Sequence, residues 1–409
     1  MRILWTKANK LLPLHSGGDI RSFHILKYLS AHHDVTFLSY YDGAQDEEYE
    51  SQLKTHFPSA IAISAGKIIP RSLDYLRRLS SPYPYAVSRF QSPIVTEKIN
   101  ALLGTANYGV VIADFLDAAI NFPGTLSIPR VLFQHNVESE IWRRHAASET
   151  NPAKRLMYKA EFKKMLRYEK QIVRNFDHVI AVSENDRQLM QSWTDPSRIT
   201  VVPTGVDVAQ YRPVPNHADP APIVMFIGAM DWEPNIDAVE FFCAEMWSRI
   251  LTKIPDARFL IVGRNPDRRV QKLAAPSIEI TGRVESVAEY LHQAAVVVVP
   301  LRIGGGTRLK IYEAMSAAKA VVSTTVGAEG LDVTPSKDIL IADDPHSFAG
   351  SVITLLQDAA LRRRYEKAAL ATAGKYDWPA IAVKFAAVLE SVVAKKMRSK
   401  GLPGSQSSP

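Results

Sequence analysis

The stretch of this sequence best suited to binding an anion is a run of glycines followed by two cations. Residues 304–306 are all glycine, they follow a short apolar run, and a helical pattern begins near Thr307. Glycines let the backbone turn tightly and let a ligand approach it, and the unpaired N–H groups at a helix start bind phosphate. Arg308 and Lys310 lie in the first turn, where each exposed charge opposes the helix dipole by about 0.3–1 kcal/mol. The pattern therefore predicts an anion site.

This glycine run matches neither common nucleotide-binding motif. The chain lacks GxxxxGK[ST], and residues 304–306 do not follow the GxGxxG spacing. Interpretations as a P-loop NTPase or a dehydrogenase therefore lose their main support. A simpler interpretation pairs Lys310 with Glu313 and turns Arg308 toward solvent, so that the glycines only form a loop. We favour the anion site because the apolar run, the glycines and the inverted charge occur together.

His135 is the second candidate for chemistry. It follows the apolar run 131–133, which places it at the carboxyl end of a predicted strand, where the ligands of open sheets bind. Paired with a carboxylate it can move a proton, although a lone histidine is more often structural. Asp114 also ends an apolar run and is a weaker candidate. Asn136 and Glu138 are weaker still, because Asn136 can simply cap the next helix.

Two series of alternating strands and helices must position these residues. Short apolar runs, typical of parallel strands buried on both faces, alternate with helical patterns in each half of the chain. The Pro-rich segment 213–222 separates the halves. The fold class is therefore α/β, with two doubly wound Rossmann-like domains facing across a cleft that holds the ligand site. The predicted strands are residues 3–5, 35–40, 110–113, 131–133 and 179–182, then 223–227, 259–262, 278–281, 296–299, 321–323 and 339–341.

The composition argues against several classes of protein. The chain has 409 residues, 46% of them apolar, but no apolar run reaches the roughly 20 residues of a spanning helix. The first residues turn polar at once, unlike a signal peptide. The single cysteine, Cys243, allows neither a disulfide framework nor a thiolate metal site. We therefore expect a cytoplasmic protein without a thiolate metal site.

The net charge of +7 is concentrated in one segment. Residues 154–174 carry eight Lys or Arg against two Glu, which leaves the rest of the chain near neutral. A nucleic-acid-binding protein would spread its basic residues over a face with aromatic side chains, so we expect no nucleic acid partner. The segment has an amphipathic helical pattern. It is either a solvated helix face or a peripheral contact with the cytoplasmic membrane surface.

Segments in order along nearly the whole chain resemble the retaining glycosyltransferases of family 4 (glycosyl transferases group 1), which have the GT-B fold. Each segment is weak alone, but together they are specific. Gly17-Gly18 resembles the N-terminal glycine loop of the family, and residues 259–263 and 280–284 resemble the strands that hold the base. Residues 201–207, with Tyr211 and Pro213, resemble the motif I-P-N-G-V-D…F-x-P, with Thr204 in place of Asn. Residues 313–315, with 321–322, resemble the motif E-A-M…G-x-P-V-V.

This resemblance implies roles for individual residues. Glu313 would accept hydrogen bonds from the ribose hydroxyls of a UDP- or GDP-linked sugar donor, and the N–H groups of residues 306–308 would contact its diphosphate. No metal and no further cofactor would be needed. The implied catalytic residues are His135, Glu313, Arg308 and Lys310. The implied donor-binding residues are Gly17, Gly18, Gly228, Arg264, Arg283, Val284, Gly305, Gly306, Thr307, Arg308, Lys310 and Glu313.

Two departures from the family pattern stand out. Gly305 occupies the position of the first Glu in E-x7-E, so the contact of that Glu with the transferred sugar is missing or supplied elsewhere. The basic pair that the family carries after the first strand of the second domain is also absent from residues 228–235. We predict that Arg308 and Lys310, with help from Arg302, replace that positive charge.

The resemblance completes the functional prediction. Residues 1–205, joined by a C-terminal helix at about 376–396, would form the acceptor-side domain, residues 206–375 would bind the nucleotide sugar, and residues 397–409 would be disordered. The reaction would add a sugar to a glycan or lipid-linked acceptor with retention, in polysaccharide or glycolipid biosynthesis. The alternatives are a nucleotide-sugar epimerase of the same fold and a non-catalytic glycosyltransferase-like subunit, which Gly305 slightly favours.

Overall fold

The computed structural model describes residues 1–14, 16–66, 69–213, 220–303 and 308–399. The chain forms two compact units, Met1–Pro203 with Ile381–Pro409, and Thr204–Ala380. The predicted boundaries were 205/206 and 375/376, a few residues from those of the structure. Most of the predicted linker, residues 214–219, and the predicted tail from residue 400 onward lie outside the described residues.

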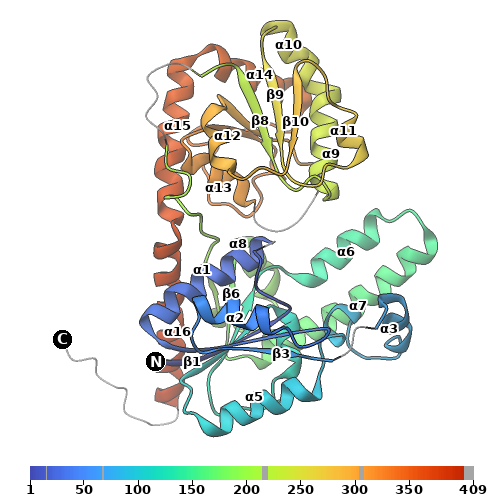
Figure 1. Cartoon of the computed structure of the whole chain (residues 1–409), viewed down its shortest axis with the longest axis vertical. Helices are drawn as coiled ribbons and strands as arrows, with labels where there is room; N and C mark the ends of the chain where they lie inside the picture. The colour runs from blue at the N-terminus through green and yellow to red at the C-terminus, as the bar shows by residue number, and fades with distance from the viewer. Residues whose placement is uncertain (15, 67–68, 214–219, 304–307, 400–409) are drawn as a thin grey trace, which may run out of the picture. The chain divides into compact units, whose positions relative to one another are not determined.

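The first unit is built on a parallel sheet of seven strands in the order β3-β2-β1-β4-β5-β6-β7 (Figure 1). The strand order reverses between β1 and β4, where ligands of doubly wound folds bind. Its strands are β1 Arg2–Ala8, β2 Asp34–Tyr41, β3 Ala60–Ser64, β4 Val110–Asp114, β5 Arg130–Gln134, β6 His178–Ala181 and β7 Ile199–Val201. Its helices are α1 Gly17–His32, α2 Glu47–His56, α3 Arg71–Arg77, α4 Tyr85–Ser88, α5 Pro93–Thr105, α6 Glu138–Ser148, α7 Pro152–Asn175 and α8 Glu184–Met190.

The second unit is built on a parallel sheet of six strands in the order β10-β9-β8-β11-β12-β13. Together the two sheets confirm the predicted α/β class with two Rossmann-like folds. The strands are β8 Ile223–Ile227, β9 Arg258–Val262, β10 Ile278–Gly282, β11 Val296–Val299, β12 Ala320–Ser323 and β13 Leu340–Ile341. The helices are α9 Glu233–Phe242, α10 Ser248–Lys253, α11 Arg268–Gln271, α12 Val287–Gln293, α13 Leu309–Ser316, α14 Pro345–Gln357 and α15 Ala359–Ala373, and α16, Trp378–Ser399, leads back into the first unit.

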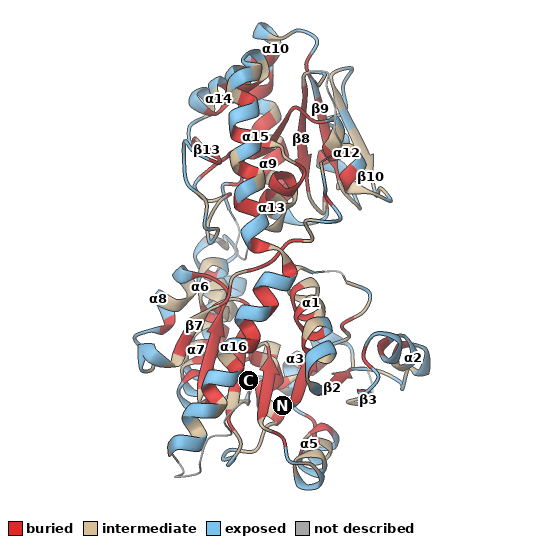
Figure 2. Ribbon diagram, turned by 90° about the vertical axis from the view of Figure 1, so that its left-hand side faces the viewer, coloured by how far each residue is buried: buried red, intermediate tan, exposed pale blue. Residues whose placement is uncertain are grey.

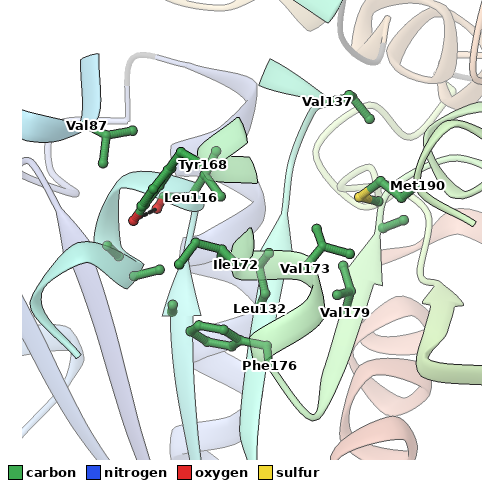
Figure 3. Close-up of a cluster of buried hydrophobic side chains, with 14 of the residues drawn as sticks. Val87, Leu116, Leu132, Val137, Tyr168, Ile172, Val173, Phe176, Val179 and Met190 are labelled. Carbon is green, nitrogen blue, oxygen red and sulfur yellow. Dashed lines mark hydrogen bonds between the residues drawn. The ribbon is translucent and has the colours of Figure 1, made fainter. Parts of the chain in front are cut away.

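Helix α7 is the basic segment of the sequence, and its inner face belongs to the core of the first unit. Tyr168, Ile172 and Phe176 pack against β5 and β6 in the cluster of Figure 3. The central strands of both sheets are buried on both faces (Figure 2), as their continuous apolar runs predict. None of the described helices is long and apolar enough to cross a membrane.

Gly205 lies against the ring of Trp378 in the second unit. A Cβ atom at this position would lie 2.4 Å from Cε3 of Trp378, and Trp378 is buried. Gly205→Ala is therefore expected to lower the free energy of unfolding by about 1–3 kcal/mol, as overpacking does. Urea denaturation would measure this loss, and Gly350→Ala, where a Cβ meets nothing within 4 Å, is the matched control. Equal stability of the two variants would contradict the prediction.

Candidate functional site

A cation and an amide meet at the carboxyl edge of the second sheet. Lys310, in the first turn of α13, donates a hydrogen bond from Nζ to Oδ1 of Asn235 over 2.8 Å. Asn235 belongs to α9, and its Nδ2 donates to the carbonyl oxygen of Ala229 over 2.8 Å. The Lys310 ammonium also lies 4.1 Å from the ring centroid of Phe226 on β8. Lys310 therefore reaches from α13 to the turn that follows β8.

Gly228 makes this approach possible. A Cβ atom on Gly228 would lie 2.8 Å from Nζ of Lys310 and 2.5 Å from Nδ2 of Asn235. Residue 228 starts the segment in which the family's basic pair is missing. The structure thus brings Lys310, from elsewhere in the chain, to the place where the sequence lacks a cation. We name Gly228, Asn235 and Lys310 the anion corner.

The environment of Lys310 changes its proton affinity. Burial lowers the pKa of Lys310 to about 7, the positive charge of Arg308 adds to this effect, and Glu313 opposes it. Arg308 is only 3% exposed and directly precedes α13, which begins at Leu309. The prediction that Arg308 lies in the first turn of a helix beginning near Thr307 is therefore corrected, because Arg308 precedes the helix. The simpler sequence interpretation, in which Arg308 points to solvent, is also wrong.

Glu313 lies one turn further along α13, and Tyr211 is its partner. The Tyr211 hydroxyl hydrogen-bonds the Glu313 carboxylate, and burial raises the pKa of Glu313 despite this bond. Burial raises the pKa of Tyr211, and the contact with Glu313 adds to this effect. Tyr211 is buried, so it can fix the orientation of the carboxylate. Sequence analysis noted Tyr211 only as part of a motif, because nothing local connects it with Glu313.

The other predicted donor-site residues fall into three groups. Gly305, Gly306 and Thr307 lie outside the described residues. Arg264 and Val284 are half-buried, whereas Arg283 is exposed. The suggestion that Arg302 helps to replace the missing cations is corrected: its guanidinium pairs with Asp237 at 2.5 Å and lies over the ring of Phe241. Arg302 is therefore directed at α9, where a carboxylate and a ring already hold it.

In the first unit, His135 is buried in a network of charged groups. Its ring is 2% exposed and stacks on Phe115 with centroids 3.7 Å apart. Nδ1 lies 2.8 Å from Nη1 of Arg21, and Nε2 lies 2.7 Å from Oδ1 of Asp114. Because a guanidinium only donates, Nδ1 accepts and Nε2–H donates to Asp114. The His135 side chain is therefore buried at the strand end and not exposed there.

Charge in this network is fixed by burial and by neighbours. Burial lowers the pKa of His135 to about 3, although Asp114 opposes this. Burial alone would raise the pKa of Asp114, but Lys7 and His135 lower it to about 2. Neutral His135 therefore orients Asp114 and Arg21, while a contact of His135 with a sugar stays a prediction. Arg21 and Lys7 were missed, because nothing in the sequence near either residue connects it with His135.

The glycine pair of the first unit lies at the start of α1. Gly17 is the first residue of the helix, and Ser16 caps it in a reciprocal arrangement with Asp19. A Cβ atom on Gly18 would lie 2.3 Å from Cζ of Phe115. Gly18 thus lets α1 approach the Phe115 ring that stacks on His135. The role of Gly18 seen in the structure is therefore one of packing.

Replacing His135 with phenylalanine is expected to lower the free energy of unfolding by about 2 kcal/mol. The ring keeps its volume, but the buried groups of Asp114 and Arg21 each lose a hydrogen-bond partner, and such losses cost about 1–3 kcal/mol. Urea denaturation followed by circular dichroism measures this change. His56 is exposed, so His56→Phe is the matched control. If His135→Phe lowered the free energy of unfolding no more than this control does, the role given to His135 would be wrong.

The model for glycosyltransferase family 4 matches residues 16–210, and the model for glycosyl transferases group 1 matches residues 221–358. A D-inositol 3-phosphate glycosyltransferase of Kineococcus radiotolerans is 24% identical over 267 residues, which cover 57% of this chain and 61% of that protein. The chain thus spans about three fifths of the length of this relative.

Solved structures resemble the chain over almost its full length. Sucrose-phosphate synthase from Thermosynechococcus elongatus has a TM-score of 0.69 at 20% identity, covering 96% of this chain and 99% of that one. The Anabaena protein HepE, in complex with UDP and glucose, has a TM-score of 0.64 at 15% identity, covering 96% and 100%. At such identities the likeness concerns the fold, and it agrees with the predicted GT-B class.

Proposed function

The chain belongs to the group 1, family 4 glycosyltransferases, and we propose that it transfers a sugar from a nucleotide diphosphate sugar to a glycan or lipid-linked acceptor. We place this reaction in cytoplasmic polysaccharide or glycolipid biosynthesis. The observation that carries the proposal is the position of Lys310 in the anion corner, one turn from Glu313 on the same helix. A cation and an acceptor thus lie on one side of α13, where they can hold the phosphate and ribose of one ligand.

The chemistry of these groups suits a departing nucleotide diphosphate. Glu313 is an acceptor that can hold two neighbouring hydroxyls, and Tyr211 keeps it in place. Lys310 and Arg308 bring positive charge to the start of α13, where charge develops on the leaving group, and such preorganised groups stabilise a transition state. The UDP and glucose of the HepE structure support a ligand of this class.

We further propose that the reaction proceeds with retention and without a divalent metal. We infer retention of the anomeric configuration from the family to which the chain belongs. Metal independence rests on Lys310 and Arg308, whose positive charge can take over the neutralisation that a metal gives in other transferases. Gly305 stands where the family has a glutamate, so the contacts to the transferred sugar are expected to differ from those of the family pattern.

A thermal-shift panel with UDP, GDP, ADP and their sugar conjugates, all in EDTA, tests the donor site. Ligands of the folded state raise the melting temperature by mass action, and we expect one nucleotide to give a clear shift. The anomeric configuration of the product, measured by NMR, then tests retention. Absence of any shift would contradict the proposal and favour a non-catalytic subunit, and a shift that needs added magnesium would contradict metal independence.

A further inference from the structure

Helix α3 turns its apolar side chains outward and its acid inward. Leu73 and Leu76, one turn apart, are 62% and 63% exposed, whereas Asp74 between them is buried. Leu79 just beyond the helix is 50% exposed, and Ile94 at the start of α5 is 54% exposed. A helix in water normally shows the opposite pattern. We name these four apolar residues, Leu73, Leu76, Leu79 and Ile94, the leucine face.

Several contacts hold this inverted helix in place. Oδ1 of Asp74 accepts a hydrogen bond from Nε of Arg78 over 2.9 Å, and a second nitrogen of Arg78 donates to the carbonyl oxygen of Ser88. Nζ of Lys164, from α7, donates to the carbonyl oxygen of Leu79 over 3.0 Å. The outward direction of the leucines is therefore fixed by the structure of the first unit, and α7 adjoins them.

The surroundings of the leucine face carry positive charge. Arg71 and Arg77 on α3 are exposed. Arg77 and Arg78 line a hollow of about 670 Å³ together with Pro93, which directly precedes Ile94, and with one acidic residue, Glu97. On α7, the two glutamates of residues 154–174, Glu161 and Glu169, are buried. The charges that this basic helix shows to water are accordingly nearly all positive.

We propose that the leucine face and the adjoining basic side of α7 rest on the surface of an anionic lipid bilayer. Leucines would enter the boundary between headgroups and acyl chains, while arginines and lysines meet the lipid phosphates, as interfacial amphipathic helices do. Predominantly positive charge around outward leucines suits an anionic surface. This inference goes beyond the proposed transferase activity and does not depend on it.

Cosedimentation of the full chain with vesicles tests the proposal. The protein is expected to bind vesicles of an equal mixture of phosphatidylglycerol and phosphatidylcholine, and not vesicles of phosphatidylcholine alone. The triple variant L73S/L76S/L79S should bind at least about tenfold more weakly, because hydrophobic insertion is lost. Arg71→Gln with Arg77→Gln should weaken binding mainly at low salt, since only the screened electrostatic part is removed.

A matched control uses exposed apolar residues of the same unit that lie away from this face. Leu189 on α8 and Val383 on α16 are 37% and 51% exposed, and the variant L189S/V383S should bind like the unchanged protein. Circular dichroism must show that both serine variants are folded. Equal vesicle binding by the triple variant and the unchanged protein would overturn the proposal. The proposal would also be overturned if gel filtration showed the unchanged protein as a dimer and the triple variant as a monomer, because the leucine face would then be a contact between two copies.

Discussion

Replacing Lys310 with methionine is expected to weaken nucleotide-sugar binding about 10- to 100-fold while the second unit stays folded. Lys310 is the cation that reaches the anion corner, 2.8 Å from Asn235. A hydrogen bond to a charged group contributes about 1.5–3 kcal/mol, and about 1.4 kcal/mol corresponds to a factor of ten. Isothermal titration calorimetry with the donor identified by the thermal-shift panel measures the change.

The same lysine predicts how donor affinity depends on pH. Burial lowers the pKa of Lys310 to about 7 in the free protein, and a bound diphosphate favours the protonated amine. Binding therefore takes up a proton above pH 7, so the affinity is highest below that pH and falls as the pH rises through it. Lys310→Arg keeps its charge throughout and should lose this dependence. A nucleotide sugar is the right ligand because its diphosphate does not titrate near neutral pH.

Two variants separate a local effect from a general one. Lys337 is an exposed lysine of the same unit, so Lys337→Met removes the same charge and should leave the affinity unchanged. Gly228→Ala keeps every charge but places a Cβ atom 2.8 Å from Nζ of Lys310, so it should weaken donor binding. If Lys337→Met and Lys310→Met had equal effects, or if the nucleotide bound normally without Lys310, the role of the anion corner would be wrong.

The strands that the sequence predicts best are those buried on both faces. Residues 35–40 and 223–227 were predicted from continuous apolar runs, and they form β2 and β8 almost residue for residue. The edge strands β3 and β7 were missed, because they are short and partly exposed and so have no continuous apolar run. Between β8 and β9, a π-helical turn at Cys243–Trp247 joins α9 to α10.

The candidate site was predictable only where its residues are close in sequence. Lys310 and Glu313 share one helix, and their chemistry could be inferred from that stretch. Asn235, 75 residues from Lys310, and Tyr211 could not be assigned to it, since only the folded sheet brings them there. For His135 the strand end was predicted correctly, but its burial depends on Arg21, 114 residues away, and on the ring of Phe115.

Replacing Glu169 with alanine is expected to lower the free energy of unfolding of the first unit by about 3–5 kcal/mol. This buried carboxylate of α7 accepts hydrogen bonds from the N–H groups of Glu138 and Ser139, from the Ser139 hydroxyl and from Nε2 of Gln134. It therefore caps α6, which has no side-chain cap of its own. Without this carboxylate, several buried donors have no hydrogen-bond acceptor, and each such donor costs about 1–3 kcal/mol of stability. The total loss is therefore similar to that caused by breaking a buried ion pair.

Hydrogen exchange followed by mass spectrometry localises this effect. Amides in the first turns of α6 should exchange faster in Glu169→Ala, because they lose their cap. Glu97 on α5 is exposed, and Glu97→Ala removes the same side chain without a buried partner, so its exchange should match that of the unchanged protein. Unaltered exchange across residues 138–148 in Glu169→Ala would show that the carboxylate does not hold the helix start.

The neighbour of Glu169 gives this cap a dependence on pH. Burial raises the pKa of Glu169 to about 7, and burial with the charge of Glu169 raises the pKa of Glu138 to about 8, from a usual 4.5. Both folded-state pKa values lie above the unfolded one, so their contribution to stability is complete below pH 4.5 and is lost as the pH rises through 7 and 8. Melting temperatures between these limits should therefore fall with pH in the unchanged protein. Glu138→Gln removes one of the two like charges. It should raise the free energy of unfolding above pH 8 by at least about 1 kcal/mol, roughly the value of one pKa unit. If the melting temperature of this variant fell with pH as steeply as that of the unchanged protein, the two carboxyl groups would not interact.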